Sequence, residues 1–250
     1  MRYWVDQINR ALDEDRFQLF AQRLVNVKQT TEALHFEVLL RMTGEDGEII
    51  SPFMFFPAAE HYHLANRIDR WVLTKSIQWL EEKSQTQDIE RICINLSGQS
   101  VNDIDFHSYV AQLLQQLSPE LRAKICLEIT ETVAVTNLQS ASDFVDEIKK
   151  LGSTIALDDF GAGSSSFGYI KNLSADVLKI DGQFIKNLID EPLDNAAVRC
   201  FVDVAKILNL ETVAEFVDSP KILEQVKALG IDYAQGFLLH KPEPIDKIIK

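Results

Sequence analysis

Short apolar runs alternate with longer amphipathic segments along most of the chain. Short runs rich in β-branched residues favour buried strands, whereas apolar residues at helical spacing favour helices that cover a sheet. The predicted strands are Phe17–Leu24, Phe36–Arg41, Ile92–Leu96, Ile125–Ile129, Thr154–Asp158, Val177–Ile180, Thr212–Glu215 and Tyr233–Phe237. This alternation is typical of βα repeats, and eight strands can close a (β/α)8 barrel.

Helical patterns lie between these strands. They cover Arg67–Leu80, Phe106–Leu117, Ala141–Leu151, Ala196–Leu208 and Pro220–Leu229. Gly152 and Gly230 follow two of them directly, where glycine commonly ends a helix. No helical pattern separates the first two strands, and Thr30, Thr31 and Glu32 indicate a turn. We therefore predict an α/β, TIM-like (β/α)8 barrel whose first strand is antiparallel.

Length and composition fit one domain over residues 1–250, since a barrel of this kind takes about 250 residues. Of these residues, 46% are apolar, yet the longest apolar runs are far too short to cross a bilayer. The N-terminus also lacks the apolar segment of a signal peptide. We expect no direct membrane insertion by this segment; a membrane location would require another part of a longer chain.

The cysteines indicate the redox setting of the protein, and the net charge limits the kinds of partner that it can bind. Cys93, Cys126 and Cys200 are few, odd in number and without CxxC spacing, so we expect a reducing, cytoplasmic setting. The net charge of −13 argues against a DNA or RNA polymer as partner, because such binding depends on clustered Lys and Arg. An acidic protein can still bind a phosphate ligand where metal ions reverse the local field.

A polar side chain recurs in or just after nearly every predicted strand from the second onward. These residues are Glu37, Arg41, Asn95, Glu128, Glu131, Asp158, Asp159, Lys179, Asp181, Glu215 and Gln235. One charged residue at a strand end is usually the solvated start of a loop. Recurrence on seven successive strands is different, because the carboxyl ends of barrel strands converge on the face that carries the active site.

Five carboxylates would then crowd around one axis. They are Glu37, Glu128, Asp158, Asp159 and Glu215. Unpaired carboxylates repel one another, and bound cations would remove that cost. Oxygen ligands, with the Asn95 amide added, suit Mg²⁺ or Mn²⁺ better than Zn²⁺. Adjacent Asp158 and Asp159 can serve two ions, so the pattern predicts a two-metal hydrolase on a barrel.

Seven segments between about Phe17 and Pro242 resemble, in order, the motifs of the EAL-domain family of cyclic-di-GMP phosphodiesterases. They are Glu37-Val38-Leu39-Leu40-Arg41, Ile94-Asn95-Leu96-Ser97, Glu128-Ile129-Thr130-Glu131, Asp158-Asp159-Phe160-Gly161-Ala162-Gly163, Leu178-Lys179-Ile180-Asp181, Ala214-Glu215 and Gln235-Gly236-Phe237. Most of these segments alone are weak evidence for the family, but seven of them in the family's order are specific to it.

The resemblance assigns a role to each of these polar residues. Glu37, Asn95, Glu128 and Asp158 would hold one Mg²⁺ or Mn²⁺, and Asp158, Asp159 and Glu215 the second. Lys179 would lie beside the attacking water and Gln235 would position that water. Arg41, Asp181 and Gln235 would contact substrate, and Glu131 would support the loop that begins at Phe160 and links dimerisation to metal binding.

The implied reaction is hydrolysis of cyclic di-GMP to linear pGpG, by a homodimer whose chain is one domain of a larger bacterial signalling protein. The chain departs from the family pattern at Val38, Ser164, Phe216 and Asp218. None of these residues is an expected metal ligand. Phe216 and Ser164 would alter substrate access or loop coupling, which affects rate more than activity.

Two other functions stay open: a catalytically weak receptor that binds cyclic di-GMP, and an interaction domain without a nucleotide. The receptor hypothesis is weakened because every expected metal ligand is present. The interaction-domain hypothesis leaves the converging carboxylates unexplained. Asp159-Phe160-Gly161 lacks the other protein-kinase motifs. His61 and His63 cannot share one helix face as zinc ligands, and Trp71 and Trp79 are predicted to pack in the core.

Overall fold

A computed structural model describes residues 1–28, 32–163 and 167–249. Thr30, Thr31 and Ser164, which figured in the sequence predictions, lie outside the described residues. The strands are β1 (Phe17–Arg23), β2 (Val25–Asn26), β3 (Leu34–Thr43), β4 (Ile49–Ile50), β5 (Ile89–Asn95), β6 (Ile125–Thr130), β7 (Thr154–Phe160), β8 (Val177–Ile180), β9 (Glu211–Ala214), β10 (Tyr233–Ala234) and β11 (Glu243–Pro244).

Helices separate most of the strands from β4 to β10, but none lies between β7 and β8 in the described residues. The helices are α1 (Arg2–Asp13), α2 (Pro52–His61), α3 (Ala65–Lys83), α4 (Gly98–Val101), α5 (Ile104–Gln116), α6 (Pro119–Arg122), α7 (Glu131–Thr136), α8 (Leu138–Leu151), α9 (Gly182–Lys186), α10 (Pro192–Leu208) and α11 (Pro220–Leu229), with a 3₁₀ turn at Ile245–Lys247. Gly152 and Gly230 end α8 and α11 in the left-handed conformation, as predicted.

The strands form one curled sheet in the order β11-β1-β3-β5-β6-β7-β8-β9-β10-β2. All eight predicted strands are present, although β9 and β10 end sooner than expected, before Glu215 and Gln235. The predicted hairpin is confirmed, because β1 and β3 pair antiparallel from Phe17 opposite Met42 to Arg23 opposite Phe36. The TIM-like barrel with an antiparallel first strand is therefore the observed fold.

Two short strands that the pattern did not predict complete the sheet. After Leu24, the chain continues from β1 into β2, which pairs antiparallel with β10 at Asn26–Tyr233 and Val25–Ala234. On its other edge, β1 pairs with β11. Successive parts of the first strand therefore bond to β3 and to β10, and so bring the two ends of the sheet together.

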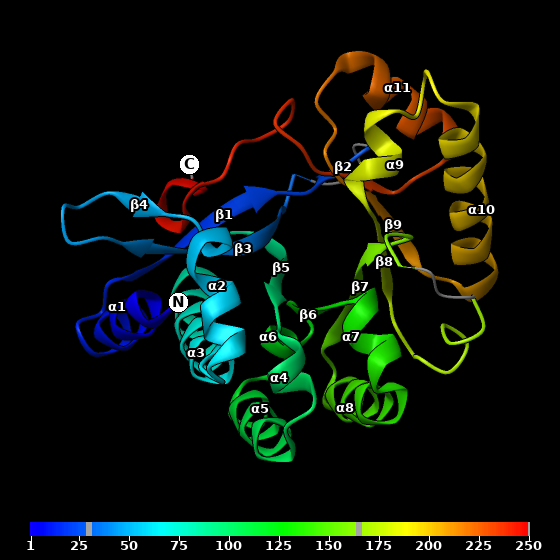
Figure 1. Ribbon diagram of the computed structural model, residues 1–250. Helices are drawn as coiled ribbons and strands as arrows, with labels where there is room; N and C mark the ends of the chain where they lie inside the picture. The colour runs from blue at the N-terminus through cyan, green and yellow to red at the C-terminus, as the bar shows by residue number, and fades with distance from the viewer. Residues whose placement is uncertain (29–31, 164–166, 250) are drawn as a thin grey trace.

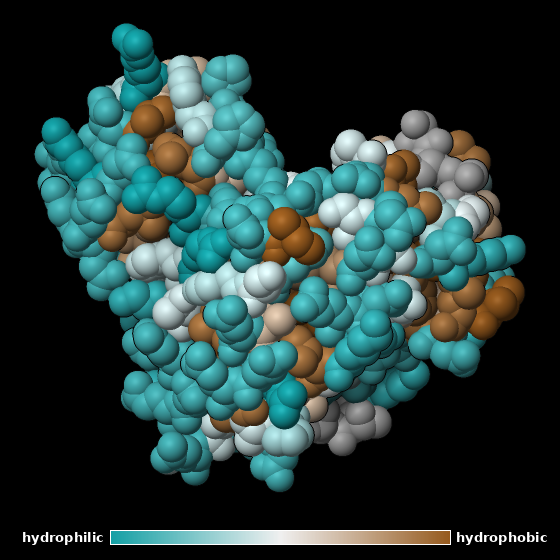
Figure 2. All heavy atoms as spheres, turned by 90° about the horizontal axis from the view of Figure 1, so that it is seen from below, coloured by the Kyte–Doolittle hydropathy of each residue, from teal (hydrophilic) through white to brown (hydrophobic). Residues whose placement is uncertain are grey.

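The helices pack around the outside of the curled sheet, with α3, α5, α8 and α10 among them (Figure 1). Trp79 is 8% exposed and packs edge-on against Phe36, and Trp71 lies against Phe17, which confirms the predicted packing role of both tryptophans. Figure 2 shows one outer face as mostly polar, with apolar atoms in small groups. No helix in the described part of the chain has the length and apolar content to cross a membrane.

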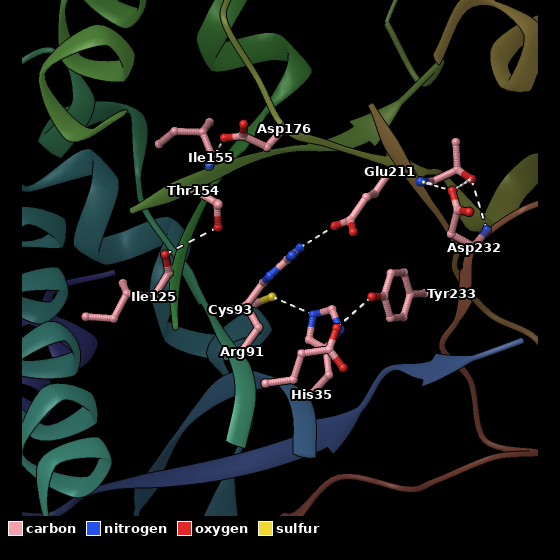
Figure 3. Close-up of polar contacts among 12 residues, drawn as sticks. His35, Arg91, Cys93, Ile125, Thr154, Ile155, Asp176, Glu211, Asp232 and Tyr233 are labelled. Carbon is pink, nitrogen blue, oxygen red and sulfur yellow. Dashed lines mark hydrogen bonds and ion pairs between the residues drawn. The ribbon is translucent and has the colours of Figure 1, made fainter. Parts of the chain in front are cut away.

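Polar contacts fasten the N-terminal ends of the strands to one another (Figure 3). Arg91 Nη1 lies 2.6 Å from Glu211 Oε2, which joins β5 to β9. The backbone N–H and hydroxyl of Thr212 both donate to Asp232, and the hydroxyl of Tyr233 donates to Glu90. Charged groups at this end therefore have partners of opposite charge or hydrogen-bond donors.

Candidate active site

Seven of the eleven polar residues of the predicted site form one layer at the C-terminal end of the barrel interior, here called the C-terminal layer. It consists of Glu37, Asn95, Glu128, Asp158, Lys179, Glu215 and Gln235. Two positions before each of these lies a residue of a middle layer. That layer consists of His35, Cys93, Cys126, Ala156, Val177, Val213 and Tyr233, six of which form a separate apolar cluster. Since residues two apart on a strand face the same side, this spacing aims the C-terminal layer inward.

Strand pairing fixes the neighbours within the C-terminal layer. Asn95 is directly opposite Glu128 across β5 and β6. The Asn95 amide donates to Glu37 Oε1 at 2.6 Å, and the Gln235 amide donates to Glu37 Oε2 at 2.7 Å. Glu37 is thereby held between β5 and the end of β10. The two amides fix where the carboxylate oxygens of Glu37 point.

Lys179 lies at the centre of this layer and is 1% exposed. Its Nζ contacts four carboxylates of the layer. They are Glu128 at 2.7 Å, Asp158 at 3.0 Å, Glu215 at 3.1 Å and Glu37 at 3.5 Å. Burial alone would lower the pKa of the ammonium, but attraction to these acids, Asp158 first, raises the pKa well above its ordinary value. Lys179 is therefore a permanent cation in the middle of the layer.

One cation does not balance the carboxylates around it. Burial raises the pKa of Glu128 well above its ordinary value, and raises the pKa of Glu215 to about 8, with further repulsion from Asp158 and Glu37. These shifts mean that the charged forms of both acids are destabilised in the bare protein. Additional positive charge in this layer would relieve that cost.

The carboxylates of Asp158, Asp159 and Glu215 form a second group, with one oxygen of each within 4.8 Å of the others. Consecutive residues of a regular strand face opposite sides, so Asp158 and Asp159 could not both reach the site from one. The pairing of β7 with β8 is irregular between Leu157 and Phe160, and Asp159 has a φ of 53°. This bulge turns the second aspartate toward the site, as bulges beside active sites commonly do.

The donor atoms of these two groups fit divalent cations. They are carboxylate and amide oxygens, the ligands that Mg²⁺ and Mn²⁺ prefer. Glu128 Oε1 and Gln235 Oε1 are buried and accept no hydrogen bond from any described residue. Buried acceptors without donors are costly and rare, so these oxygens beside several carboxylates fit a site for divalent cations.

Two cavities open beside the C-terminal layer, and Leu39 and Arg41 line both. The larger, of about 380 Å³, also contains Glu37, Glu215 and Gln235, whereas the smaller, of about 290 Å³, extends under α2 and α4. The Arg41 guanidinium lies 5.4 Å from the centre of the Phe20 ring and donates to the Leu40 carbonyl. A fixed cation therefore lies between two adjoining cavities.

Glu131 and Asp181 lie at the edge of the site. Glu131 is 3% exposed and accepts a 2.9 Å hydrogen bond from the Gly161 N–H, at the start of the loop that follows β7. Asp181 caps α9 by accepting from the Gln183 N–H, and its charge contributes to raising the pKa of Asp159 to about 6, after burial and Asp158. Asp181 does not line either of the two cavities.

Some polar residues near the site escaped the sequence analysis. Gln22 of β1 accepts from the Gln235 amide, so the antiparallel strand also contributes to the layer. Asp69 of α3 is buried and accepts from the hydroxyls of Ser97 and Ser100, which fixes the chain just after Asn95. Asp69 could have been found from the sequence, because it is a charged residue on the apolar face of a predicted helix.

His61 and His63, which the sequence analysis did not expect to bind zinc, lie at and just after the end of α2. His61 ends α2, and His63 follows it with a φ of 56°. Both residues are exposed, as expected for histidines at a helix end.

Fold and site together define a (β/α)8 barrel with an acidic centre at the C-terminal ends of its strands. The family model described as "EAL domain" matches residues 5–242, and the chain belongs to the EAL domain family.

Named relatives and solved structures agree with this assignment. The chain is 37% identical over 242 residues to the cyclic di-GMP phosphodiesterase PdeB of Shewanella oneidensis and 38% identical over 241 residues to PdeF of Escherichia coli. The matches cover 97% and 96% of this chain but 28% and 32% of those proteins, so the chain spans about a third of their length.

Two solved structures with bound cyclic di-GMP have the same fold. The PaMucR phosphodiesterase complex has a TM-score of 0.88 at 30% identity, covering 99% of this chain and all of that one. The FimX EAL domain of Pseudomonas aeruginosa has a TM-score of 0.87 at 26% identity, covering 96% of each chain.

Proposed function

We propose that this chain hydrolyses one phosphodiester of cyclic di-GMP to give linear pGpG, with two Mg²⁺ or Mn²⁺ ions at the C-terminal layer. The observation that carries the proposal is the set of carboxylates around Lys179, which exceeds the charge of that lysine and lies beside a cavity. Relatives named as cyclic di-GMP phosphodiesterases over nearly the whole chain support the substrate.

Two groups of ligands would hold the ions. Glu37, Asn95, Glu128 and Asp158 would bind one, and Asp158, Asp159 and Glu215 the other, since the oxygens of the latter three already lie within 4.8 Å of one another. Cations bound there would lower the pKa of a bound water and offset the charge that develops on the phosphodiester.

The chain's own side chains then position and stabilise the reacting groups. Lys179 remains protonated, and its charge favours the hydroxide form of the attacking water. The buried Oε1 of Gln235, which has no donor among the described residues, can accept a hydrogen bond from that water while the side-chain NH₂ stays bonded to Glu37. Attack in line with the departing ribose 3′ oxygen forms one P–O bond and breaks another. The proton lost by the water ends on that oxygen, so a 5′-phosphate and a 3′-hydroxyl result.

Arg41 and Asp181 would contact the substrate, the first from the cavity walls and the second from outside both cavity linings. Arg41 lies between the two cavities and would pair with a phosphate of the dinucleotide. Asp181 would contact substrate from the end of β8. Glu131 would keep the loop that begins at Phe160 in place through its bond to Gly161, and we propose that this loop joins the site to a homodimer contact.

The test is direct. The purified protein is incubated with cyclic di-GMP and Mg²⁺ or Mn²⁺, with EDTA as control, and the products are separated by chromatography. Metal-dependent appearance of pGpG is the expected result. Nucleotide bound but not cleaved after long incubation would indicate a receptor instead, and no binding by calorimetry would indicate an interaction domain without a nucleotide.

Assembly is tested separately. We propose a homodimer, and that this chain is one domain of a longer bacterial signalling protein, which the matched share of its relatives supports. Light scattering of the eluted protein is expected to give twice the 28.4 kDa mass of one chain.

A further inference from the structure

Phe216 has a backbone conformation that large side chains rarely adopt. Its φ is 55°, in the left-handed region, and it directly follows Glu215 of the C-terminal layer. A bulky residue in this region is a genuine outlier, because its Cβ crowds the backbone. Strain of this kind persists where surrounding contacts hold it, and it clusters at functional sites.

Two contacts hold the Phe216 ring in one place. The ring lies directly over Gly182, where any side chain would collide with it. Lys186 Nζ lies 4.1 Å from the ring centre, a cation–π distance. A ring whose role was to fill the core would be buried, yet Phe216 is 56% exposed. Its orientation is therefore fixed while part of its surface stays open to solvent.

The open surface faces the larger cavity. Phe216 lines that cavity together with Phe237, which is 64% exposed, and with Arg41, Glu215 and Gln235. Two exposed aromatic rings thus border a space of about 380 Å³ that also contains residues of the proposed catalytic layer. Flat, π-rich groups such as nucleobases stack on rings presented in this way.

We propose that Phe216 stacks against one guanine of the bound dinucleotide and thereby sets substrate affinity in this chain. The inference rests on the proposed function, and assigns a binding role to a residue that is not a metal ligand. Gly182, by leaving room for the ring, and Lys186, by covering part of it, act as positioning residues. Stacking does not depend on one hydrogen-bonding edge, so this contact contributes affinity and leaves the choice of base to other groups.

Three variants at this position separate the ring from the backbone. Phe216→Leu keeps an apolar side chain but removes the ring, Phe216→Gly also removes the left-handed strain, and Phe216→Tyr keeps the ring. We expect KM for cyclic di-GMP to rise roughly tenfold in the Leu and Gly variants, the factor for loss of one modest stacking contact, with kcat changed by less than about twofold. The Tyr variant should retain the original KM.

A matched control is Tyr3→Leu, which removes another exposed ring, 61% exposed on α1. Its KM should equal that of the unaltered chain. Thermal unfolding of every variant checks that the fold is kept. If the unaltered chain binds cyclic di-GMP without cleaving it, the same ratios are measured as Kd.

Two failures are distinguishable. An unaltered chain that neither binds nor cleaves cyclic di-GMP overturns the proposed function together with this inference. An active chain whose Leu and Gly variants keep the original KM, or lose kcat with KM unchanged, overturns only the stacking role of Phe216.

Discussion

The two ends of the barrel interior contain similar residue types but treat charge in opposite ways. At the N-terminal end, Arg91 pairs with Glu211, and Asp232 accepts from Thr212 and from the Lys28 ammonium at 2.8 Å. At the C-terminal end, one buried ammonium faces four carboxylates. The first end is close to charge balance within the protein itself, whereas the second is not.

This difference separates structural from functional charge. A paired group gains little from an added ligand, because its partner already satisfies it. The C-terminal layer has surplus acids, and some of its buried acceptors have no donor among the described residues. Both are costs that a bound cation would remove. Charge imbalance, rather than the presence of charge, therefore marks the site.

The largest effect is expected when a ligand of the unbalanced end is removed. Glu37→Ala should reduce turnover of cyclic di-GMP by about 10³-fold or more, since a metal site contributes several kcal/mol to the transition state. Glu211→Ala, at the balanced end, is the matched control and should leave turnover per folded molecule unchanged. Initial rates at saturating Mg²⁺ measure both. Undiminished activity in Glu37→Ala would rule out this metal site.

Removing the Lys179 ammonium should lower the free energy of unfolding far more than removing a cation from the balanced N-terminal end. Lys179→Met leaves its four carboxylates without a counter-charge, and breaking a buried ion pair from one side costs about 3–5 kcal/mol. Lys149→Met, which breaks the part-exposed pair with Asp176, should cost less than about 1 kcal/mol. Urea unfolding in EDTA at pH 7.5 measures both. Equal losses of unfolding free energy in the two variants would contradict the difference between the two ends of the barrel.

The balanced end should respond as a structural ion pair. Arg91→Met leaves Glu211 unpaired, but Glu211 is 42% exposed, so solvent screening limits the expected loss to about 1–2 kcal/mol. Adding Glu211→Leu should recover part of that stability, because two apolar residues can replace an ion pair at little cost. Urea unfolding of the single and double variants tests this; a larger loss in the double variant would oppose it.

The smallest and most specific effect is a pH dependence confined to the unbalanced end. The folded-state pKa of Glu215 is raised from 4.5 to about 8, so the folded protein binds this proton more tightly than the unfolded chain. Its contribution is complete below pH 4.5 and is lost as pH rises toward 8. Asp159, with a pKa of about 6, adds to the loss in the lower part of this window.

Melting temperatures between pH 5 and pH 8.5 measure that slope. In EDTA, Tm should fall with rising pH, and Glu215→Gln should flatten the decline. Saturating Mg²⁺ should also flatten it, because ions that bind the charged carboxylates favour the folded protein more at high pH. A slope that is the same with EDTA and Mg²⁺ would count against cations at this layer.

Much of the barrel and of its site could be predicted from the sequence because both depend on local periodicity. Buried parallel strands appear in a sequence as apolar runs, and residues two apart on a strand share a face. Glu128 and Lys179 could therefore be placed on the barrel interior from their positions in these runs. The family motifs supplied the order of these residues.

Other features depend on contacts between distant segments and left no local pattern. The strand β2 has two residues, too few to show alternation, so the closure of the barrel could not be predicted. The left-handed turns at Asp159 and Phe216 follow from a bulge and from the space over Gly182. The helix α1, although amphipathic, was also missed, since the predictions began at the first strand.

The way the barrel closes has a consequence for its synthesis. Gln22 and Arg23, beside the junction of β1 and β2, bond to His240 and Ile248, partners 218 and 225 positions further along the chain. At about 5–20 residues per second, a ribosome needs roughly 10–45 s to make that stretch. Until then β1 can pair with β3, but its outer edge and β2 wait for partners. The nascent chain therefore exposes a strand edge until this stretch has been made, and strand-pairing errors and chaperone binding are most consequential during that time.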